Sequence, residues 1–370
     1  MATNPLLELR ALGQSVWLDD LHRAMLEDGS LELMIREDGL RGQTSNPAIL
    51  AAAITRRPEY ADALTALLGT GLDALGVYEA LALEDVGRAA DLFRPVYEET
   101  GGRDGYVSIE VSPHLAHDTV GTIAEARRLW RALGRENVMI KIPGTIAGLE
   151  AIRSAISEGI NVNVTLLFSP ERYREVADAY CAGLEDRLAR GERIDRPASV
   201  ASFFLSRIDT LVDRRLDELA RAGQSAARAL RGKSAVACAS RAYEIYCEVI
   251  ASGRWQRLQE AGARTQRLLW ASTSTKDPAY SPIKYVEELI AFDTVSTVPP
   301  ETFEAYKRLG RPELRLEQGL AEASDVREAL EHLGIDLEDV AAQLEKEGVR
   351  KFIEPFDGLQ AWLEKRRREH

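Results

Sequence analysis

Short apolar segments alternate with longer segments of helical periodicity along most of the chain. Eight short segments are rich in apolar or β-branched residues, and most are followed by polar, proline or glycine positions, which is typical of buried β-strands. They are Ser15–Asp19, Gly42–Pro47, Tyr106–Ser112, Asn137–Pro143, Asn161–Phe168, Ala198–Ser206, Arg267–Thr273 and Phe292–Pro299.

Amphipathic helices are predicted between these strands. In Glu125–Leu133 and Ala147–Ile156, apolar residues recur three and four positions apart, with charged residues on the opposite side. A third helix is expected to begin at Pro170, with Ser169 as its N-cap, and to end at Ala189.

Two stretches, about residues 48–105 and 208–265, are longer than a simple crossover between strands requires, and both have helical patterns. We expect them to be helical insertions into a single domain that comprises residues 1–370. The highly charged tail, about residues 301–370, is also expected to be helical, with the basic run at its end exposed to solvent.

Eight strands, each followed by a helix, fit either a closed barrel or an open doubly wound sheet. The barrel is favoured because polar residues recur near the C-terminal end of nearly every strand, and in a barrel these ends meet at one mouth. An open sheet would instead concentrate its signal in one glycine-rich turn. The predicted fold class is therefore α/β, a (β/α)₈ TIM barrel with additional helices.

Composition narrows the range of partners. Hydrophobic residues make up 45% of the chain and charged residues 29%, which favours a buried core over disorder. The 47 Lys and Arg residues against 59 Asp and Glu give a net charge of −12, so nucleic acid is not an expected partner. An anionic substrate would need a locally basic pocket.

Neither a membrane nor a disulfide framework is expected. No run of about 18 uncharged apolar residues occurs, and the opening MATNPLLELR lacks the pattern of a secretory signal. The three cysteines show no CxxC spacing, which argues against disulfides and structural zinc, and Cys247 is expected to pack within a helix. These features predict a soluble, cytoplasmic protein.

Lys141 lies in an otherwise apolar strand, Val138–Pro143. Both faces of a strand in a parallel barrel are buried, so this amine must lie in the interior or against the helices. Burial without a partner disfavours the ammonium form, and a desolvated amine is what attack on a ketone and Schiff-base formation require. The alternative is a structural lysine that pairs with a carboxylate or extends to solvent.

Side chains two positions apart, at least one of them polar, recur on five strands, where they would share one face. The sets are Ser108, Glu110 and Ser112; Asn163 and Thr165; Ser202 with Phe204; Thr44 and Asn46; and Ser272 and Ser274. Any one set could be a hydrogen-bonded strand end or a turn. Because buried polar groups need partners, five strands with this pattern at one end indicate a shared polar site.

Asp19 ends the first predicted strand. Either Asp19 or Asp20 could cap the following helix. Alternatively, Asp19 lies at the mouth as a carboxylate that takes a proton from a substrate hydroxyl. It would then form a pair with Glu110 near one amine, able to divide the acid and base roles.

Other motifs do not support nucleotide or metal chemistry. The segment Gly232–Ser234 lacks the earlier glycine and the preceding strand of a phosphate-binding loop, and Gly69–Gly71 lacks the third glycine of a dinucleotide fingerprint. His114 and His117 are three apart, but no HExxH motif or cysteine accompanies them. We therefore expect no metal and no cofactor.

Several segments resemble the transaldolase family. They are GQTSNP (Gly42–Pro47), SIEV (Ser108–Val111), IKIPGTIAGL (Ile140–Leu149) and GINVNVTLLFS (Gly159–Ser169). The first resembles the family's strand-two signature, usually Thr-Thr-Asn-Pro, with Ser45 in place of a threonine, and the third resembles its active-site lysine signature. The resemblance extends over residues 15–302, and the length and the WLDDL segment resemble the longer bacterial branch of the family.

The resemblance implies a (β/α)₈ barrel that transfers a dihydroxyacetone unit between sugar phosphates without a cofactor. The usual reaction converts sedoheptulose 7-phosphate and glyceraldehyde 3-phosphate into erythrose 4-phosphate and fructose 6-phosphate, in the non-oxidative pentose phosphate pathway. By position, Lys141 would form the Schiff base and Asp19 would take the C4-hydroxyl proton. Glu110 would shuttle protons through a water that Thr165 also holds.

The resemblance also implies a set of substrate-binding residues. Asn46 and Asn163 would bind the dihydroxyacetone hydroxyls with Thr44 and Ser202 nearby, Phe204 would shape the pocket, and Arg207 would hold the distal phosphate.

One departure from the family pattern affects this phosphate site. Many members carry Ala-Ser-x-Arg on strand seven, where the arginine binds phosphate, but this chain has Ser274 at that point. We predict that Lys276 supplies the missing charge together with Arg207 and Ser272.

Three other functions remain open. The same residues could serve a class I aldolase that releases dihydroxyacetone to water. A metal-dependent barrel hydrolase could use His114, His117 and carboxylates, and a barrel without activity could act as a binding module. A homo-oligomer is also possible, with the helices of residues 208–265 as one candidate interface.

Overall fold

The computed structural model describes residues 4–370, and its centre is a closed barrel of eight parallel strands in sequence order, with β8 paired to β1. The strands are β1 (Gln14–Asp19), β2 (Gly42–Thr44), β3 (Tyr106–Glu110), β4 (Val138–Pro143), β5 (Val162–Leu167), β6 (Ser199–Phe204), β7 (Arg267–Ala271) and β8 (Thr294–Val298). All eight predicted strands and the (β/α)₈ fold class are confirmed.

Three helices that surround the barrel match their predicted segments, and their caps explain where they begin. They are α7 (Thr119–Leu133), α8 (Ile146–Ser157) and α9 (Pro170–Ala189). Thr145 and Ser169 accept hydrogen bonds from the free N–H groups of the first turns of α8 and α9, which stabilises each helix start.

The helix after β1 is capped differently from either alternative that the sequence suggested. Helix α2 (Arg23–Glu27) begins after His22, whose ring accepts a hydrogen bond from the backbone N–H of Met25 at 3.3 Å. Neither Asp19 nor Asp20 is its N-cap. Asp19 is therefore free of a capping role.

The segments predicted as helical insertions contain successive helices. Residues 48–105 include most of α4 (Pro47–Arg56) and all of η1 (Pro58–Tyr60), α5 (Ala61–Leu68) and α6 (Ala74–Glu99); residues 208–265 include most of α10 (Ser206–Arg221) and all of η3 (Ser225–Leu230), α11 (Ser234–Ala251) and α12 (Gly253–Glu260). The remaining short helices are α1 (Pro5–Ala11), α3 (Ser30–Glu37), η2 (Pro113–Leu115) and α13 (Lys284–Glu288).

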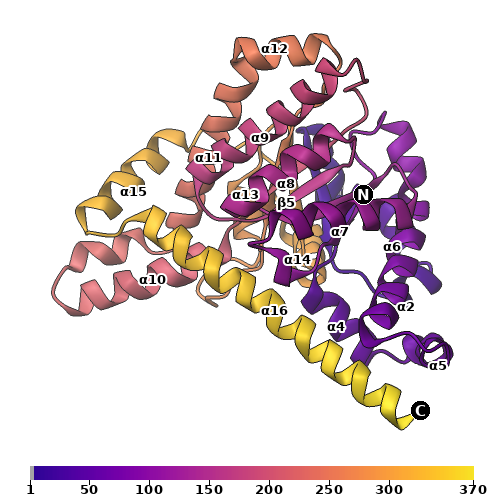
Figure 1. Cartoon of the computed structure of the whole chain (residues 1–370). Coiled ribbons are helices and arrows are strands. Elements are labelled where there is room, and N and C mark those ends of the chain that lie inside the picture. Colours follow the sequence, from indigo (N-terminus) through magenta and orange to yellow (C-terminus); the bar gives the residue numbers. More distant parts are fainter. Residues whose placement is uncertain (1–3) are drawn as a thin grey trace.

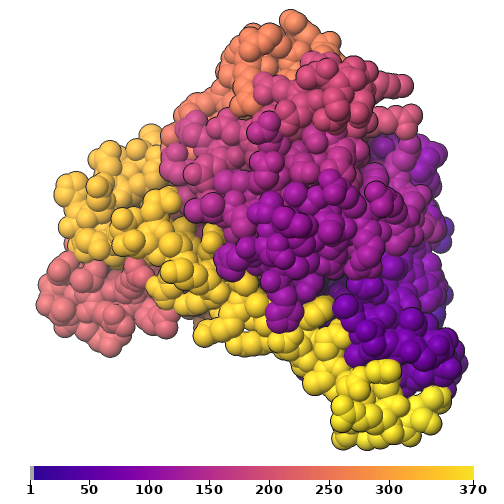
Figure 2. Space-filling view, in the orientation of Figure 1, coloured from indigo at the N-terminus to yellow at the C-terminus, as the bar shows by residue number. Residues whose placement is uncertain are grey.

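The C-terminal tail forms α14 (Pro300–Leu309), α15 (Leu320–His332) and the long helix α16 (Leu337–Glu369). Helix α16 crosses the molecule and contacts α10, β5, α4 and α6 (Figure 1). In the space-filling view, α15 and the neighbouring part of α10 form a lobe at one side, and α16 extends from this lobe along the same face (Figure 2).

Charged side chains fill the N-terminal end of the barrel. Arg267 on β7 is 4% exposed, and its guanidinium donates to Asp104 at 2.8 Å and to Ser15 at 2.9 Å. Asp104 therefore neutralises the buried Arg267 charge at this end of the barrel.

Within residues 4–370, no helix has the length and apolar character needed to span a membrane.

The prediction that Cys247 packs within its helix is wrong. Its side chain lies on the exposed face of α11, whereas Cys181 and Cys238 are buried.

Candidate active site

Lys141 lies on β4, and its side chain extends into the C-terminal half of the barrel. The residue is only 4% exposed, and its Nζ donates a hydrogen bond to the carbonyl oxygen of Ser45 at 2.9 Å. The Oε2 atom of Glu110, which pairs in register with Lys141 on β3, lies 3.5 Å from the same Nζ. The amine therefore has one carboxylate and one carbonyl partner in a nearly dry environment.

Glu110 is buried, and burial is the main cause that raises its pKa, to about 7, against the lowering effect of the Lys141 charge. Neither of its carboxylate oxygens accepts a hydrogen bond from residues 4–370. The Thr165 hydroxyl on β5 also has no hydrogen-bond partner among these residues. Unpaired polar atoms in a protein interior are rare. Their presence beside Lys141 indicates groups arranged for a ligand or a reaction.

Asp19 ends β1 and lies in a hydroxyl network. Its Oδ1 accepts a hydrogen bond from Thr44 at 2.7 Å, and the Thr44 hydroxyl lies 2.9 Å from that of Thr297 on β8. Since Thr44 gives its only proton to Asp19, Thr297 must donate to Thr44. Burial raises the pKa of Asp19, and the Lys141 charge and the Thr44 hydrogen bond oppose this rise.

Lys141, Thr165 and Asp19 line a cavity of about 150 Å³ at the C-terminal mouth of the barrel. Its lining includes ten predicted site residues: Asp19, Thr44, Asn46, Lys141, Thr165, Ser202, Phe204, Arg207, Ser272 and Lys276. A molecule bound at Lys141 that is longer than this cavity extends outward through the mouth.

Two predicted residues, Glu110 and Asn163, do not line this cavity. Asn163 is completely buried; its amide donates to Ser108 at 3.0 Å and accepts from Ser202 at 2.6 Å. Both ends of this amide are therefore engaged by the barrel interior, behind the cavity wall.

Asn46 combines a place in the cavity wall with helix capping. Its Oδ1 accepts a hydrogen bond from the backbone N–H of Ile49 at 3.0 Å and so caps α4. This contact occupies the side-chain oxygen and fixes the residue at the mouth.

Arg207, at the start of α10, is held by aromatic rings rather than by carboxylates. Its Cζ lies 5.5 Å from the ring centre of Phe204 and 5.9 Å from that of Phe352. Within residues 4–370, its Nη1 has no hydrogen-bond partner, and the carboxylates of Glu347, Asp19 and Glu110 act on its charge from a distance rather than as ion-pair partners. An arginine whose charge is not neutralised by a neighbour is suited to bind an anion.

The loop after β7 contains Ser274, at the position where many members of the resembling family carry an arginine. Ser272 has a φ of 54°, and its hydroxyl lies 2.8 Å from that of Ser206. Lys276 is exposed at the rim, and its Nζ donates to Ser274 at 2.6 Å. Both Ser274 and Lys276 line the cavity, so a positive charge is present where the usual arginine is absent.

The cavity lining also contains residues that were not predicted from the sequence, among them Thr297 and Phe352. Thr297 had a signal, because it is a polar residue near the end of a predicted strand. Phe352 had none, since it is an ordinary apolar position of α16, far from every other site residue in the sequence.

The histidines considered as metal ligands lie elsewhere. His114 is exposed, and its Nε2 lies 2.7 Å from Asp357 on α16. In the part of the chain that the structure describes, residues 4–370, no group of three or more His, Cys, Asp or Glu side chains has the geometry to hold a metal ion.

Comparisons with known proteins agree with this geometry. The family model for transaldolase/fructose-6-phosphate aldolase matches residues 16–363. A transaldolase of Trichodesmium erythraeum is 49% identical over 99% of this chain and 98% of its own length. Transaldolase 2 of a Nostoc species is 48% identical over 98% of each chain, and a transaldolase of Thermobifida fusca is 46% identical over 96% of each.

Proposed function

The chain belongs to the transaldolase/fructose-6-phosphate aldolase family, and on this basis we propose that it is a transaldolase. It is a transferase that moves a dihydroxyacetone unit between sugar phosphates, from sedoheptulose 7-phosphate to glyceraldehyde 3-phosphate, and forms erythrose 4-phosphate and fructose 6-phosphate. The observation that carries this proposal is the buried Lys141 amine, 3.5 Å from Glu110 in a cavity that also contains Asp19.

Imine formation requires a neutral amine. A proton transferred from Lys141 to the Glu110 carboxylate leaves the amine free to attack the ketose C2 carbonyl. The resulting carbinolamine loses water and becomes an iminium on Lys141. Glu110, with a pKa of about 7, holds both protonation states near neutral pH and so can give and take the protons of these steps. Thr165, whose hydroxyl is unpaired, is suited to hold the water that carries them.

Carbon–carbon bond cleavage follows from the iminium. Asp19 takes the proton of the C4 hydroxyl, the C3–C4 bond breaks, and its electron pair moves toward the iminium to give an enamine. The shortened aldose phosphate leaves with a C4 aldehyde. The reverse sequence joins the three-carbon enamine to the acceptor aldehyde and returns the proton from Asp19. Hydrolysis of the new iminium then releases the product and Lys141.

The remaining predicted residues bind substrate in this proposal. Asn46 orients the dihydroxyacetone hydroxyls, with Thr44 and Ser202 adjacent. Asn163 lies behind the cavity wall and contacts these hydroxyls by exchanging its hydrogen bond with Ser108 or Ser202. Phe204 shapes the pocket and stacks on Arg207. Arg207, assisted by Ser272 and Lys276, binds the distal phosphate. The cavity supports this arrangement because its lining brings Lys141 together with Arg207 and Lys276.

Trapping of the iminium tests the proposal directly. The protein is incubated with fructose 6-phosphate, reduced with borohydride and digested, and a three-carbon mass is expected on the peptide with Lys141. Lys141→Met should abolish both the adduct and the transfer activity. The matched control is Lys284→Met, because Lys284 is also buried and paired with a glutamate. An adduct on Lys284, or none on Lys141, contradicts the proposal.

A simple aldolase is the alternative within the same chemistry. With excess erythrose 4-phosphate, a transferase consumes the acceptor, whereas a lyase releases free dihydroxyacetone without any acceptor. The cytoplasmic location and a homo-oligomeric state remain predictions from the sequence.

A further inference from the structure

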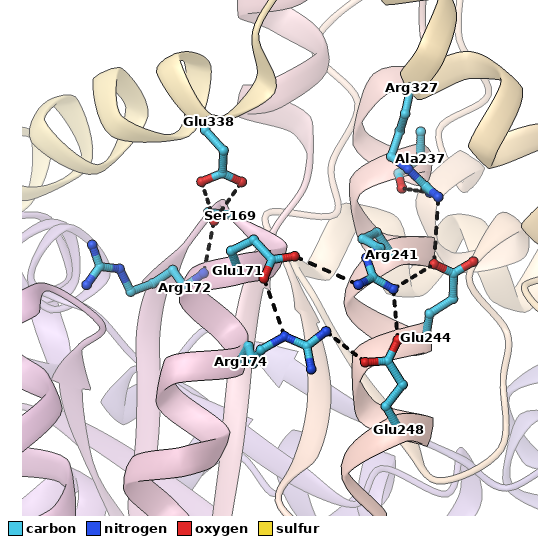
Figure 3. A network of polar contacts seen from close by, with 10 residues as sticks. All are labelled: Ser169, Glu171, Arg172, Arg174, Ala237, Arg241, Glu244, Glu248, Arg327 and Glu338. Carbon is cyan, nitrogen blue, oxygen red and sulfur yellow. Dashed lines mark hydrogen bonds and ion pairs between the residues drawn. The ribbon is translucent and has the colours of Figure 1, made fainter. Parts of the chain in front are cut away.

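Helix α16 lies across the mouth of the barrel and is anchored at its beginning. The Ser169 hydroxyl, just after β5, lies 2.9 and 2.7 Å from the two carboxylate oxygens of Glu338 in the first turn of α16. Figure 3 shows this contact above α9, beside ion pairs that connect α9, α11 and α15. The strand that carries Thr165 and the covering helix are therefore tied together.

Gly348 allows α16 to approach the site closely. A Cβ atom at this buried position would lie 2.9 Å from Leu166 Cδ2 on β5 and 3.5 Å from Arg207 Nη1. The absent side chain thus brings the next turn of α16 within reach of the cavity.

Phe352 occupies that next turn. It is 5% exposed, it lines the cavity, and its ring centre lies 6.0 Å from Lys141 Nζ and 5.9 Å from Arg207 Cζ. The mechanism above gives this ring no role. An apolar face over the reacting nitrogen removes one direction from which water can approach.

We propose that Phe352 protects the three-carbon intermediate on Lys141 from water and so sets the ratio of transfer to hydrolysis. This inference rests on the proposed transaldolase function. In the competing reaction, the enamine takes a proton on its nucleophilic carbon and becomes an iminium. Water adds to the iminium carbon, the carbon–nitrogen bond breaks, and dihydroxyacetone and the Lys141 ammonium are formed.

The test compares the partition of the intermediate in the wild type and in Phe352→Ala. With fructose 6-phosphate as donor and a fixed concentration of erythrose 4-phosphate, free dihydroxyacetone and sedoheptulose 7-phosphate are measured together. We expect their ratio to rise about tenfold in Phe352→Ala. Without acceptor, the borohydride-trapped adduct on Lys141 should also disappear faster in the variant. Phe352→Leu, which retains an apolar cover, should give an intermediate ratio.

Leu359→Ala is the control for general loosening of α16, because Leu359 is a buried residue two turns further along the same helix and does not line the cavity. An unchanged ratio in Phe352→Ala, or an equal rise in Leu359→Ala, overturns the inference. Failure of the wild type to form any adduct on Lys141 would instead contradict the proposed function itself. Circular dichroism checks that each variant is folded. If Phe352→Ala is not folded, the ratio of dihydroxyacetone to sedoheptulose 7-phosphate in Phe352→Leu is compared with that in Leu359→Ala instead.

Discussion

Glu110 and Lys141 are register partners on adjacent strands, and 3.5 Å separates Glu110 Oε2 from Lys141 Nζ. Both residues are buried, and neither Glu110 oxygen accepts a hydrogen bond from the described residues 4–370. The carboxylate therefore interacts with the amine by charge while its lone pairs stay available. This arrangement suits proton transfer better than a structural ion pair, in which hydrogen bonds normally satisfy the buried carboxylate.

The pH dependence of the reaction should report Glu110. Its pKa of about 7 means that the carboxylate, which accepts the Lys141 proton in the proposed mechanism, is lost as the pH falls through neutrality. We expect kcat/KM for fructose 6-phosphate to fall about tenfold per pH unit below about pH 7. Glu110→Gln should lower the rate by roughly 10²- to 10⁴-fold and remove this dependence.

Glu345→Gln is the control for this experiment, because burial also raises the pKa of Glu345, on α16, but that residue does not contact Lys141. In the control, kcat/KM should still fall below about pH 7. The same fall in Glu110→Gln would show that another group, such as the substrate phosphate, titrates instead.

Arg207 should determine the preference for phosphorylated donors. Replacement by methionine keeps an apolar side chain against Phe204 and Phe352 but removes the charge. We expect KM for fructose 6-phosphate to rise roughly 100-fold while the slow reaction of unphosphorylated fructose changes little. Steady-state kinetics with both sugars measures this difference, and Arg221→Met, at the exposed end of α10, serves as the control. Equal losses for the two sugars would exclude phosphate binding by Arg207.

Lys276 should contribute less than Arg207, because it is exposed and its charge is screened by solvent. Lys276→Ala is expected to raise KM for phosphorylated substrates about threefold to tenfold, more at low ionic strength than at high. Lys233→Ala removes another exposed lysine, one that pairs with Glu322, and should leave KM unchanged. If KM in Lys276→Ala equals that of the wild type at low salt, Lys276 does not replace the missing arginine.

Gly148 should be essential for the strand that carries Lys141. A Cβ atom at this position would lie 1.9 Å from the carbonyl oxygen of Pro143, at the end of β4. Since backbone must move to relieve this overlap, Gly148→Ala should lower the free energy of unfolding by about 3 kcal/mol. Gly358→Ala on α16 meets no atom within 4 Å and should raise it by about 0.5–1 kcal/mol. Urea denaturation measures both, and similar values for the two variants would contradict this account.

Much of the fold could be predicted from local pattern alone. The apolar stretch before Pro143 marks a strand because both faces of a parallel barrel are buried. The alternation in Tyr106–Glu110 marks another because successive side chains of a strand point to opposite faces. The start of α9 follows from Ser169 and Pro170, whose side chains act within one turn. The cap of α2 could not be predicted in the same way, because Asp19, Asp20 and His22 all offer an acceptor, and the backbone path after β1 selects among them.

The sequence by itself determined the eight strand segments and the recurrence of polar residues near their ends, since both depend on patterns within short segments. The roles of Lys141, Glu110 and Asp19 are predictions that rest on the resemblance to the transaldolase family. Tertiary structure decided which of these groups share the cavity. It left Asn163 behind the wall, completed the Asp19 network with Thr297, and brought Phe352 over Lys141 through a helix more than 200 residues away. Such contacts depend on how α16 packs across the barrel mouth, and no local pattern of apolar and polar residues encodes that packing.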